Sequence, residues 1–157
     1  MNQLAHIFIT YIILNLFTSE AKEYFVFIVI FSIILDIDHL PGYFRMLFLD
    51  KVERNSMKIK DYVIMFRSIL QEPLGILIIE AIIGLLYLFG IRNIILVIAA
   101  ASIFIHWVID FLTVHTKPFM PFNDGIFSLF FHTKKQRIIS EVIITLISGI
   151  IFFVLWL

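Results

Sequence analysis

The longest apolar runs of this chain have the length of membrane-spanning helices. Pro73–Ile91, Ile94–Leu112 and Ile138–Leu157 approach or reach the roughly 20 residues that an α-helix needs to cross the hydrocarbon core. Lipid offers the backbone no hydrogen-bond partners, so a chain that crosses it must satisfy its N–H and C=O groups internally, as a helix does. The hydrophobic content of 61% also exceeds the roughly 45–50% of soluble domains. These features predict an all-α integral membrane protein.

Two further apolar runs are shorter. Leu4–Phe17 and Tyr24–Leu35 flank the polar residues 18–23, which predicts a helical hairpin. No internal repeat or low-complexity linker divides the chain, and its 157 residues suit one domain. We therefore expect a single membrane-embedded domain, residues 1–157, with about five transmembrane helices.

Basic residues gather in two long connections between the apolar runs. Because positive residues favour the cytoplasmic side, we expect both connections and the N-terminus in the cytoplasm. Within the first connection, apolar residues recur at helical spacing over Ile59–Leu70, which predicts one amphipathic helix in the membrane interface. The zero net charge gives no electrostatic reason to expect nucleic acid as a partner. The connections hold ten of the twelve Lys and Arg residues: Arg45, Lys51, Arg54, Lys58, Lys60, Arg67, Lys117, Lys134, Lys135 and Arg137.

Ionisable residues that are costly near lipid collect on the same predicted side. Asp36, Asp38 and His39 follow the second short run, and such residues at a membrane edge usually mark a functional site. His106 and Asp110 are four residues apart, so both project from one face of a helix. The residues near the corresponding ends of the other segments are His6, Arg67, Glu72 and His115.

This set of residues suits a divalent cation bound by nitrogen and oxygen. The chain has no cysteine, which excludes thiolate ligands, and imidazole with carboxylate suits zinc or a similar cation. The pair His106 and Asp110 supplies one ligand of each kind, and Asp36 with His39 could do the same. Asp38 could bridge the ligands or act as a base, while an arginine nearby would clamp a phosphate.

The same residues also allow a purely structural interpretation. The cluster at residues 36–39 could be a polar helix end among lipid headgroups, although two acids there oppose the helix dipole. His106 could make a hydrogen bond between helices. Arg67 could extend to lipid phosphates, and Glu72 could complement the dipole of the helix that follows it.

Two motifs resemble those of the YdjM-type membrane-bound metal-dependent hydrolases. They are Asp36-Ile37-Asp38-His39 after an apolar helix and the His106-x-x-x-Asp110 pair within Ser102–Thr113. His6 and the Pro118–Phe122 segment fall where that family has its early histidine and its proline-aromatic stretch, so the resemblance spans most of the chain. It implies an inner-membrane hydrolase with a cluster of metals, distantly similar to zinc-dependent phospholipase C and nuclease folds.

One stretch departs from the family pattern. Before its third helix the family usually has His-Arg, followed shortly by another His. Here Arg67 is kept, but Phe66 and Gln71 stand where the two histidines would be. Either Glu72 compensates, or fewer metals bind, or catalysis is lost.

From the residues and the resemblance together, we predict a hydrolase of a phosphoester, most simply a membrane lipid, at the cytoplasmic leaflet of the plasma membrane. The cofactor would be one or more divalent ions such as zinc, and Asp38 and Arg67 would serve catalysis. The alternative is a non-catalytic membrane protein that binds metal, lipid or protein through a degenerate site. A transporter is disfavoured because the ionisable residues cluster in one leaflet. The predicted metal ligands are His6, Asp36, Asp38, His39, Glu72, His106, Asp110 and His115.

Overall fold

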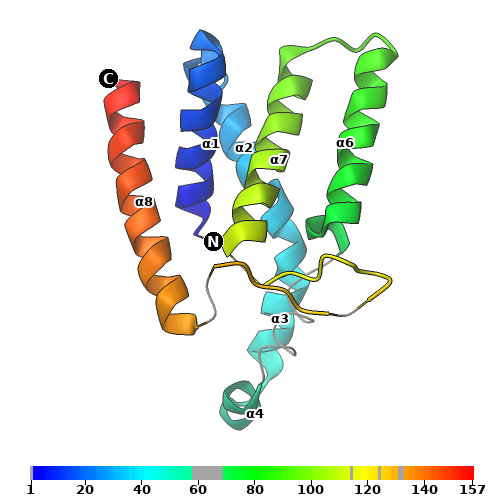
Figure 1. Cartoon of the computed structure of the whole chain (residues 1–157), viewed down its shortest axis with the longest axis vertical. Helices are drawn as coiled ribbons and strands as arrows, with labels where there is room; N and C mark the ends of the chain where they lie inside the picture. The colour runs from blue at the N-terminus through cyan, green and yellow to red at the C-terminus, as the bar shows by residue number, and fades with distance from the viewer. Residues whose placement is uncertain (1, 58–68, 114, 124, 131–132) are drawn as a thin grey trace.

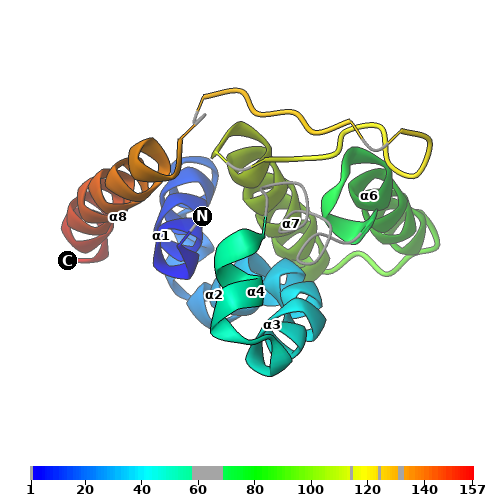
Figure 2. The same ribbon diagram turned by 90° about the horizontal axis from the view of Figure 1, so that it is seen from below.

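Helices form nearly all of the computed structural model, which describes residues 2–57, 69–113, 115–123, 125–130 and 133–157. Four of them, α8, α1, α7 and α6, stand in a row, and α2 packs against one side of the row (Figure 1, Figure 2). Within the described residues no β-strand forms, so the predicted all-α fold is confirmed. The α-helices are α1 (Gln3–Phe17), α2 (Phe25–Ile33), α3 (Leu40–Phe48), α4 (Lys51–Ser56), α6 (Pro73–Leu88), α7 (Ile94–Thr113) and α8 (Lys134–Trp156), and the 3-10 turns are η1 (Ser19–Lys22), η2 (Ile34–His39) and η3 (Ile69–Gln71).

Three helical stretches are long and apolar enough to cross a membrane. They are Phe25–Phe48, which joins α2, η2 and α3, then Ile94–Thr113 and Lys135–Trp156. Helices α1 and α6 have only 15 and 16 residues. At about 1.5 Å per residue they are about 23 Å long, shorter than a hydrocarbon core of about 30 Å. The first turn of α1 exposes Leu4 and buries Ala5 and His6, both of which are 0% exposed.

The acidic cluster at residues 36–39 does not close a helix, contrary to the prediction. The chain changes from α2 into the 3-10 turn η2 and continues directly as α3. Pro41 lies in the first turn of α3 and has no N–H to give to the carbonyl of Ile37, which instead accepts from the N–H of Leu40. The cluster therefore lies in the middle of a continuous helical stretch, with its side chains half-buried.

Helix α6 is shorter than the apolar run that predicts it. Its last turn closes at Gly90, whose φ of 98° is unfavourable for residues with a Cβ. The N–H of Gly90 donates to Tyr87 O and that of Ile91 to Leu86 O, as in a Schellman cap. The glycine thus ends the helix before the apolar sequence ends.

Aromatic side chains hold α8 against α1. The ring of Phe152 lies 5.0 Å from that of Phe8 and 4.9 Å from that of Tyr11, centroid to centroid. The helices also approach closely at Gly149, where an added Cβ would lie 3.3 Å from Phe8 Cε2. Because α1 carries His6, this contact positions one of the predicted ligands.

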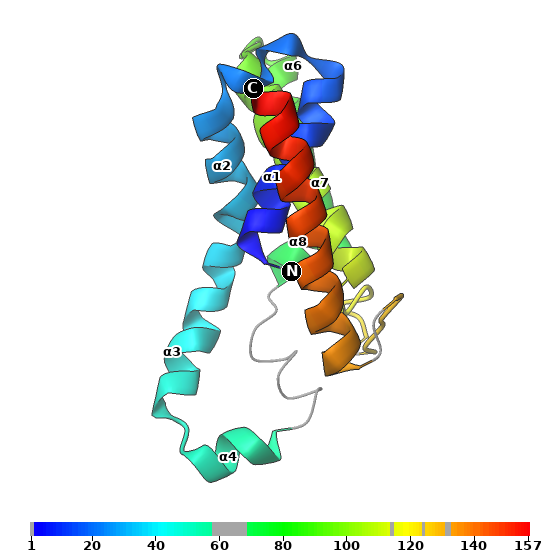
Figure 3. The same ribbon diagram turned by 90° about the vertical axis from the view of Figure 1, so that its left-hand side faces the viewer.

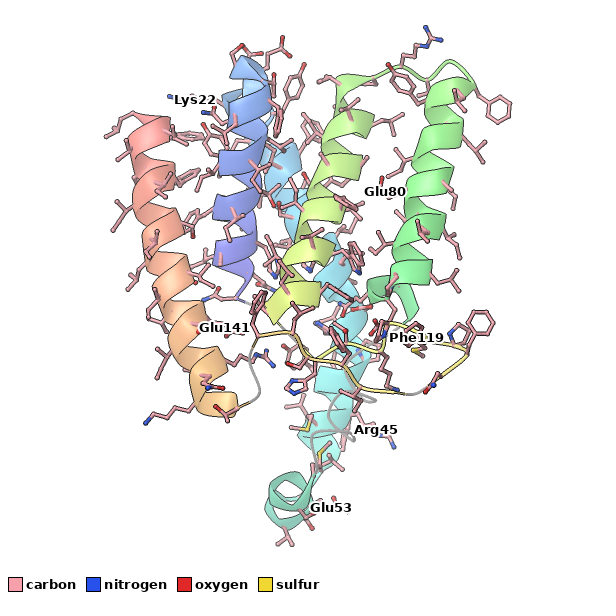
Figure 4. The ribbon with its side chains drawn as sticks, viewed as in Figure 1. Lys22, Arg45, Glu53, Glu80, Phe119 and Glu141 are labelled. Carbon is pink, nitrogen blue, oxygen red and sulfur yellow. The ribbon has the colours of Figure 1, made fainter. Side chains whose placement is uncertain are left out.

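The two ends of the bundle differ. Helices α3 and α4 and the segment that follows α7 lie at one end, while the C-terminus and the short α1–α2 and α6–α7 connections lie at the other (Figure 3). Lys22 accordingly lies opposite Arg45, Glu53 and Phe119 (Figure 4). The predicted amphipathic helix falls mostly on residues 58–68, outside the described residues.

Candidate metal centre

Three of the predicted ligands converge in the bundle interior. His6 from α1 and His106 and Asp110 from α7 are 0%, 1% and 4% exposed. One ligand atom from each residue can be chosen so that all three atoms lie within 4.8 Å of one another. The two imidazole rings stack, with centroids 3.9 Å apart and planes 7° apart. Helix α1 packs on α7, which brings together residues a hundred positions apart in sequence.

The backbone of α2 sets the tautomer of His106. Its Nδ1 forms a short hydrogen bond with the carbonyl oxygen of Ser32. A carbonyl can only accept, so Nδ1 carries the proton, and in the neutral ring Nε2 keeps its lone pair. Nε2 makes no hydrogen bond within the described part of the chain and faces the carboxylates. A partner on the outer nitrogen of this kind is what orients a metal-binding histidine.

The distances between donor atoms fit a small cation. In a tetrahedral site with bonds of about 2.0–2.1 Å, neighbouring ligand atoms lie about 3.3–3.4 Å apart. His6 Nε2 is 3.2 Å from Asp110 Oδ1, and His106 Nε2 is 3.9 Å from Asp110 Oδ2. Asp36 Oδ1 from η2 lies 3.6 Å from His106 Nε2, although Asp36 is not a member of the group that converges within 4.8 Å. The buried group of His6, His106 and Asp110 could therefore hold a metal ion.

An outer group adjoins this centre. Asp36 Oδ1 is also 3.7 Å from His39 Nε2, and His39 Nδ1 is 3.5 Å from Asp38 Oδ1. The side chains of Asp36, Asp38 and His39 are 12–19% exposed, against 0–6% for the deep trio. The exposed fraction of the side chains therefore rises from His6 in the trio to His39 in the outer group.

The remaining predicted site residues are not members of the group that converges within 4.8 Å. Glu72 is fully buried, and its Oε1 accepts a 2.9 Å hydrogen bond from the backbone N–H of Lys117. It thereby ties the start of α6 to the segment after α7. His115 is half-buried just beyond α7, next to Thr116, which pairs with Phe127. Arg67 lies outside the described residues.

Lys117 and Gln71 have structural positions that the sequence did not indicate. Lys117 contributes to the predicted membrane topology, yet it is only 3% exposed. Gln71 is not a predicted ligand, yet its amide nitrogen lies 2.6 Å from Asp38 Oδ1 and 3.2 Å from His39 Nε2. Sequence reasoning could not place either residue because both positions depend on contacts between separate segments.

Three buried hydroxyls next to the trio were also missed. Thr10, Ser32 and Ser102 are 0% exposed, and their hydroxyl oxygens have no hydrogen-bond partner among the described residues. Thr10 lies one turn from His6, and Ser102 one turn from His106. These two i, i+4 spacings are the sequence feature from which Thr10 and Ser102 could have been predicted to lie near the trio. Other hydroxyls in the helices instead donate to the carbonyl four residues back, namely those of Thr113, Thr145 and Ser148.

The Thr10 hydroxyl and His6 Nδ1 both lack a hydrogen-bond partner among the described residues, so we expect the hydroxyl to support the centre only when a cation is bound. Thr10→Val should then weaken binding of Zn²⁺ by about 10- to 100-fold, the usual cost of losing a polar partner around metal ligands. Valine keeps the shape and removes a buried hydroxyl without a partner, so the apo protein should be equally or more stable. Calorimetric titration of the detergent-purified protein measures both effects. Thr145→Val is the matched control, since its hydroxyl donates within α8 to Glu141 O. Wild-type affinity in Thr10→Val would show that the hydroxyl has no part in the centre.

Comparison of the chain with protein-family models, with curated proteins and with solved structures gives no match. Function must therefore be argued from the geometry of the centre.

Proposed function

We propose that this chain is a membrane-embedded, metal-dependent hydrolase that cleaves a phosphoester of a membrane lipid. The proposal is supported mainly by the convergence of His6, His106 and Asp110 inside the bundle. The hydrogen bond from His106 Nδ1 to Ser32 O leaves the lone pair of Nε2 available to bind a cation. Two imidazoles and a carboxylate are the ligands of many catalytic zinc sites, which keep a further position open. Zinc in such a site lowers the pKa of a bound water to about 7 and polarises a phosphoryl oxygen.

The residues of the outer group would act on the substrate. Asp38 is more exposed than the trio and contacts His39 in the outer group that adjoins it, so it is the candidate general base. Arg67 is the candidate for holding the phosphate, because a guanidinium stays charged at a membrane interface and bonds phosphate oxygens in pairs. Asp36 faces both His106 and His39, so it would fix the position of the outer group relative to the trio.

The position of the centre supports a lipid substrate. The start of α1 and the end of α7, which carry the trio, lie toward the end of the bundle that carries α3 and α4 (Figure 1). The bias of basic residues toward the connections at that end favours a cytoplasmic orientation, and the proposed location is the cytoplasmic leaflet of the plasma membrane. Helix α3 exposes Tyr43, Phe44 and Leu47 beside Arg45, a combination suited to lipid tails and headgroups. A substrate at this depth meets the outer group before the trio.

A second candidate is a non-catalytic metal-binding membrane protein. The observation in its favour is that the trio is almost completely enclosed, with side chains 0–6% exposed. An enclosed ion would stabilise the bundle without reaching a substrate. The two candidates share the metal and differ in turnover.

The experiment measures bound metal and lipid hydrolysis on the same detergent-purified protein. Elemental analysis should find a divalent cation, and hydrolysis of phospholipids in mixed micelles should stop with chelator and return with Zn²⁺. Metal without turnover on phosphate monoesters and diesters would favour the second candidate. A protein that holds no metal and cannot be loaded would overturn both.

A variant separates catalysis from binding. Asp38→Asn should lower turnover by about 100-fold or more, which is the usual contribution of a general base, and leave the metal content unchanged. Asp50→Asn is the matched control, because Asp50 is exposed at the start of α4 and asparagine caps a helix equally well. Full activity in Asp38→Asn would remove Asp38 from the mechanism.

A further inference from the structure

The amide of Gln71 is inserted into the outer group. Gln71 ends η3 and is 3% exposed. Its Nε2 lies 2.9 Å from the carbonyl oxygen of Leu35, 2.6 Å from Asp38 Oδ1 and 3.2 Å from His39 Nε2. One side chain thus touches the backbone and two ionisable residues of η2.

The orientation of this amide is set by its neighbours. The carbonyl of Leu35 and the carboxylate of Asp38 can both accept hydrogen bonds, so they require the NH₂ group to face them. The reverse orientation would press the amide oxygen against two other oxygens. Oε1 has no hydrogen-bond partner among the described residues, so the NH₂ group alone accounts for the described hydrogen bonds of the side chain.

The hydrogen bond from Gln71 uses Asp38 Oδ1, the atom that would have to bind a second cation. The two protons of the amide satisfy Leu35 O and Asp38 Oδ1, and a cation at Asp38 would have to displace them. Displacement would leave a buried amide without partners, which is costly. The deep trio differs, since its donor atoms converge with no amide between them, and it is the one such group found among the described residues.

We propose that Gln71 limits the centre to a single cation, because its amide donates to Asp38 and lies 3.2 Å from His39 Nε2 in place of a second ion. The proposal rests on the proposed function only in requiring that the trio binds a cation. Asp36 Oδ1 lies 3.6 Å from His106 Nε2 and 3.7 Å from His39 Nε2, so it already faces both positions. A ligand at position 71 would therefore complete a second site, with Asp36 shared between the two ions.

The test counts ions per chain. The protein is equilibrated with Zn²⁺ in detergent, freed of excess by gel filtration, and analysed for zinc and protein. Wild type should hold one ion and Gln71→Glu two. Without metal, Gln71→Glu should be less thermostable than wild type, because its carboxylate faces Asp38 and Leu35 O, and Zn²⁺ should restore its Tm. Gln136→Glu is the matched control, since Gln136 is exposed in the capping box of α8, which accepts either residue, and it should hold one ion.

Each result has a distinct meaning. Two ions in wild type would overturn the single-ion proposal while leaving the proposed function intact. No ion in wild type would overturn the proposed function itself. If Gln71→Glu does not fold, Gln71→His supplies a neutral ligand at the same place and should also hold two ions. One ion in every folded variant would show that Gln71 does not set the number.

Discussion

Replacing Asp110 by asparagine is expected to weaken cation binding by at least about 100-fold while leaving the protein folded. Asp110 is the carboxylate of the deep trio, 3.2 Å from His6 Nε2 and 3.9 Å from His106 Nε2. Asparagine keeps the size and one oxygen but removes the negative charge. Loss of a direct ligand charge should cost at least as much as loss of an outer partner, which reaches about 100-fold.

The change is measured as metal-dependent stability. A cation at 100 times its Kd stabilises the folded state by about 2.7 kcal/mol. With affinity reduced about 100-fold, the same concentration contributes only about 0.4 kcal/mol. Thermal unfolding in detergent, with and without Zn²⁺, should therefore show a metal-induced rise in Tm for wild type and almost none for Asp110→Asn. Without metal the variant should be as stable as wild type or more so, because a buried carboxylate has been removed.

Asp50→Asn is again the matched control and should retain the full response to Zn²⁺. If Zn²⁺ raises the Tm of Asp110→Asn as much as that of wild type, Asp110 is not a ligand. The trio would then have no negatively charged ligand. Loss of folding in Asp110→Asn, with or without Zn²⁺, would instead identify the contact with His6 as structural.

Truncating Phe152 to alanine is expected to destabilise the bundle by about 3 kcal/mol. Phe152 is 7% exposed and contacts Phe8, Tyr11 and Trp156. Buried Phe→Ala changes cost about 3–5 kcal/mol in soluble cores. Lipid solvates apolar side chains well, so most of the cost here comes from lost packing contacts, which favours the lower end of the range.

Reversible unfolding in mixed micelles measures this free energy. Phe153→Ala is the matched control, since Phe153 follows directly on α8 but is 62% exposed, and it should change stability by less than about 0.5 kcal/mol. Because α8 positions α1, Phe152→Ala should also weaken Zn²⁺ binding through His6. Equal effects of the two variants would show that α8 is not held by this aromatic cluster.

Much of the fold follows from the sequence alone. The length of the apolar runs predicts helices because lipid leaves the backbone no other partner, and α7 and α8 lie where the runs place them. The predicted ends of α6 and α2 agree less well with the structure. Gly90 closes α6 early, and Pro41 changes the helix type without ending the helical stretch. Both are local backbone effects within an otherwise apolar pattern.

For the site, the sequence by itself determined the kinds of ligand. Histidine and aspartate without cysteine restrict the centre to nitrogen and oxygen donors, and the spacing of His106 and Asp110 puts both on one helix face. The cost of placing the cluster at residues 36–39 near lipid predicts a functional site there, which stays a prediction. These conclusions depend only on residue chemistry and helical periodicity, which are local properties.

Only the tertiary structure decided which candidates meet. Packing of α1 on α7 stacks His6 on His106, and packing of α2 on α7 brings the carbonyl of Ser32 to the ring of His106. Contacts between other separate segments bond Glu72 to Lys117 after α7 and bring the amide of Gln71 to Asp38 in η2. The physical reason is that hydrogen bonds and coordination act over about 2–4 Å, so they depend on helix placement that no single segment encodes.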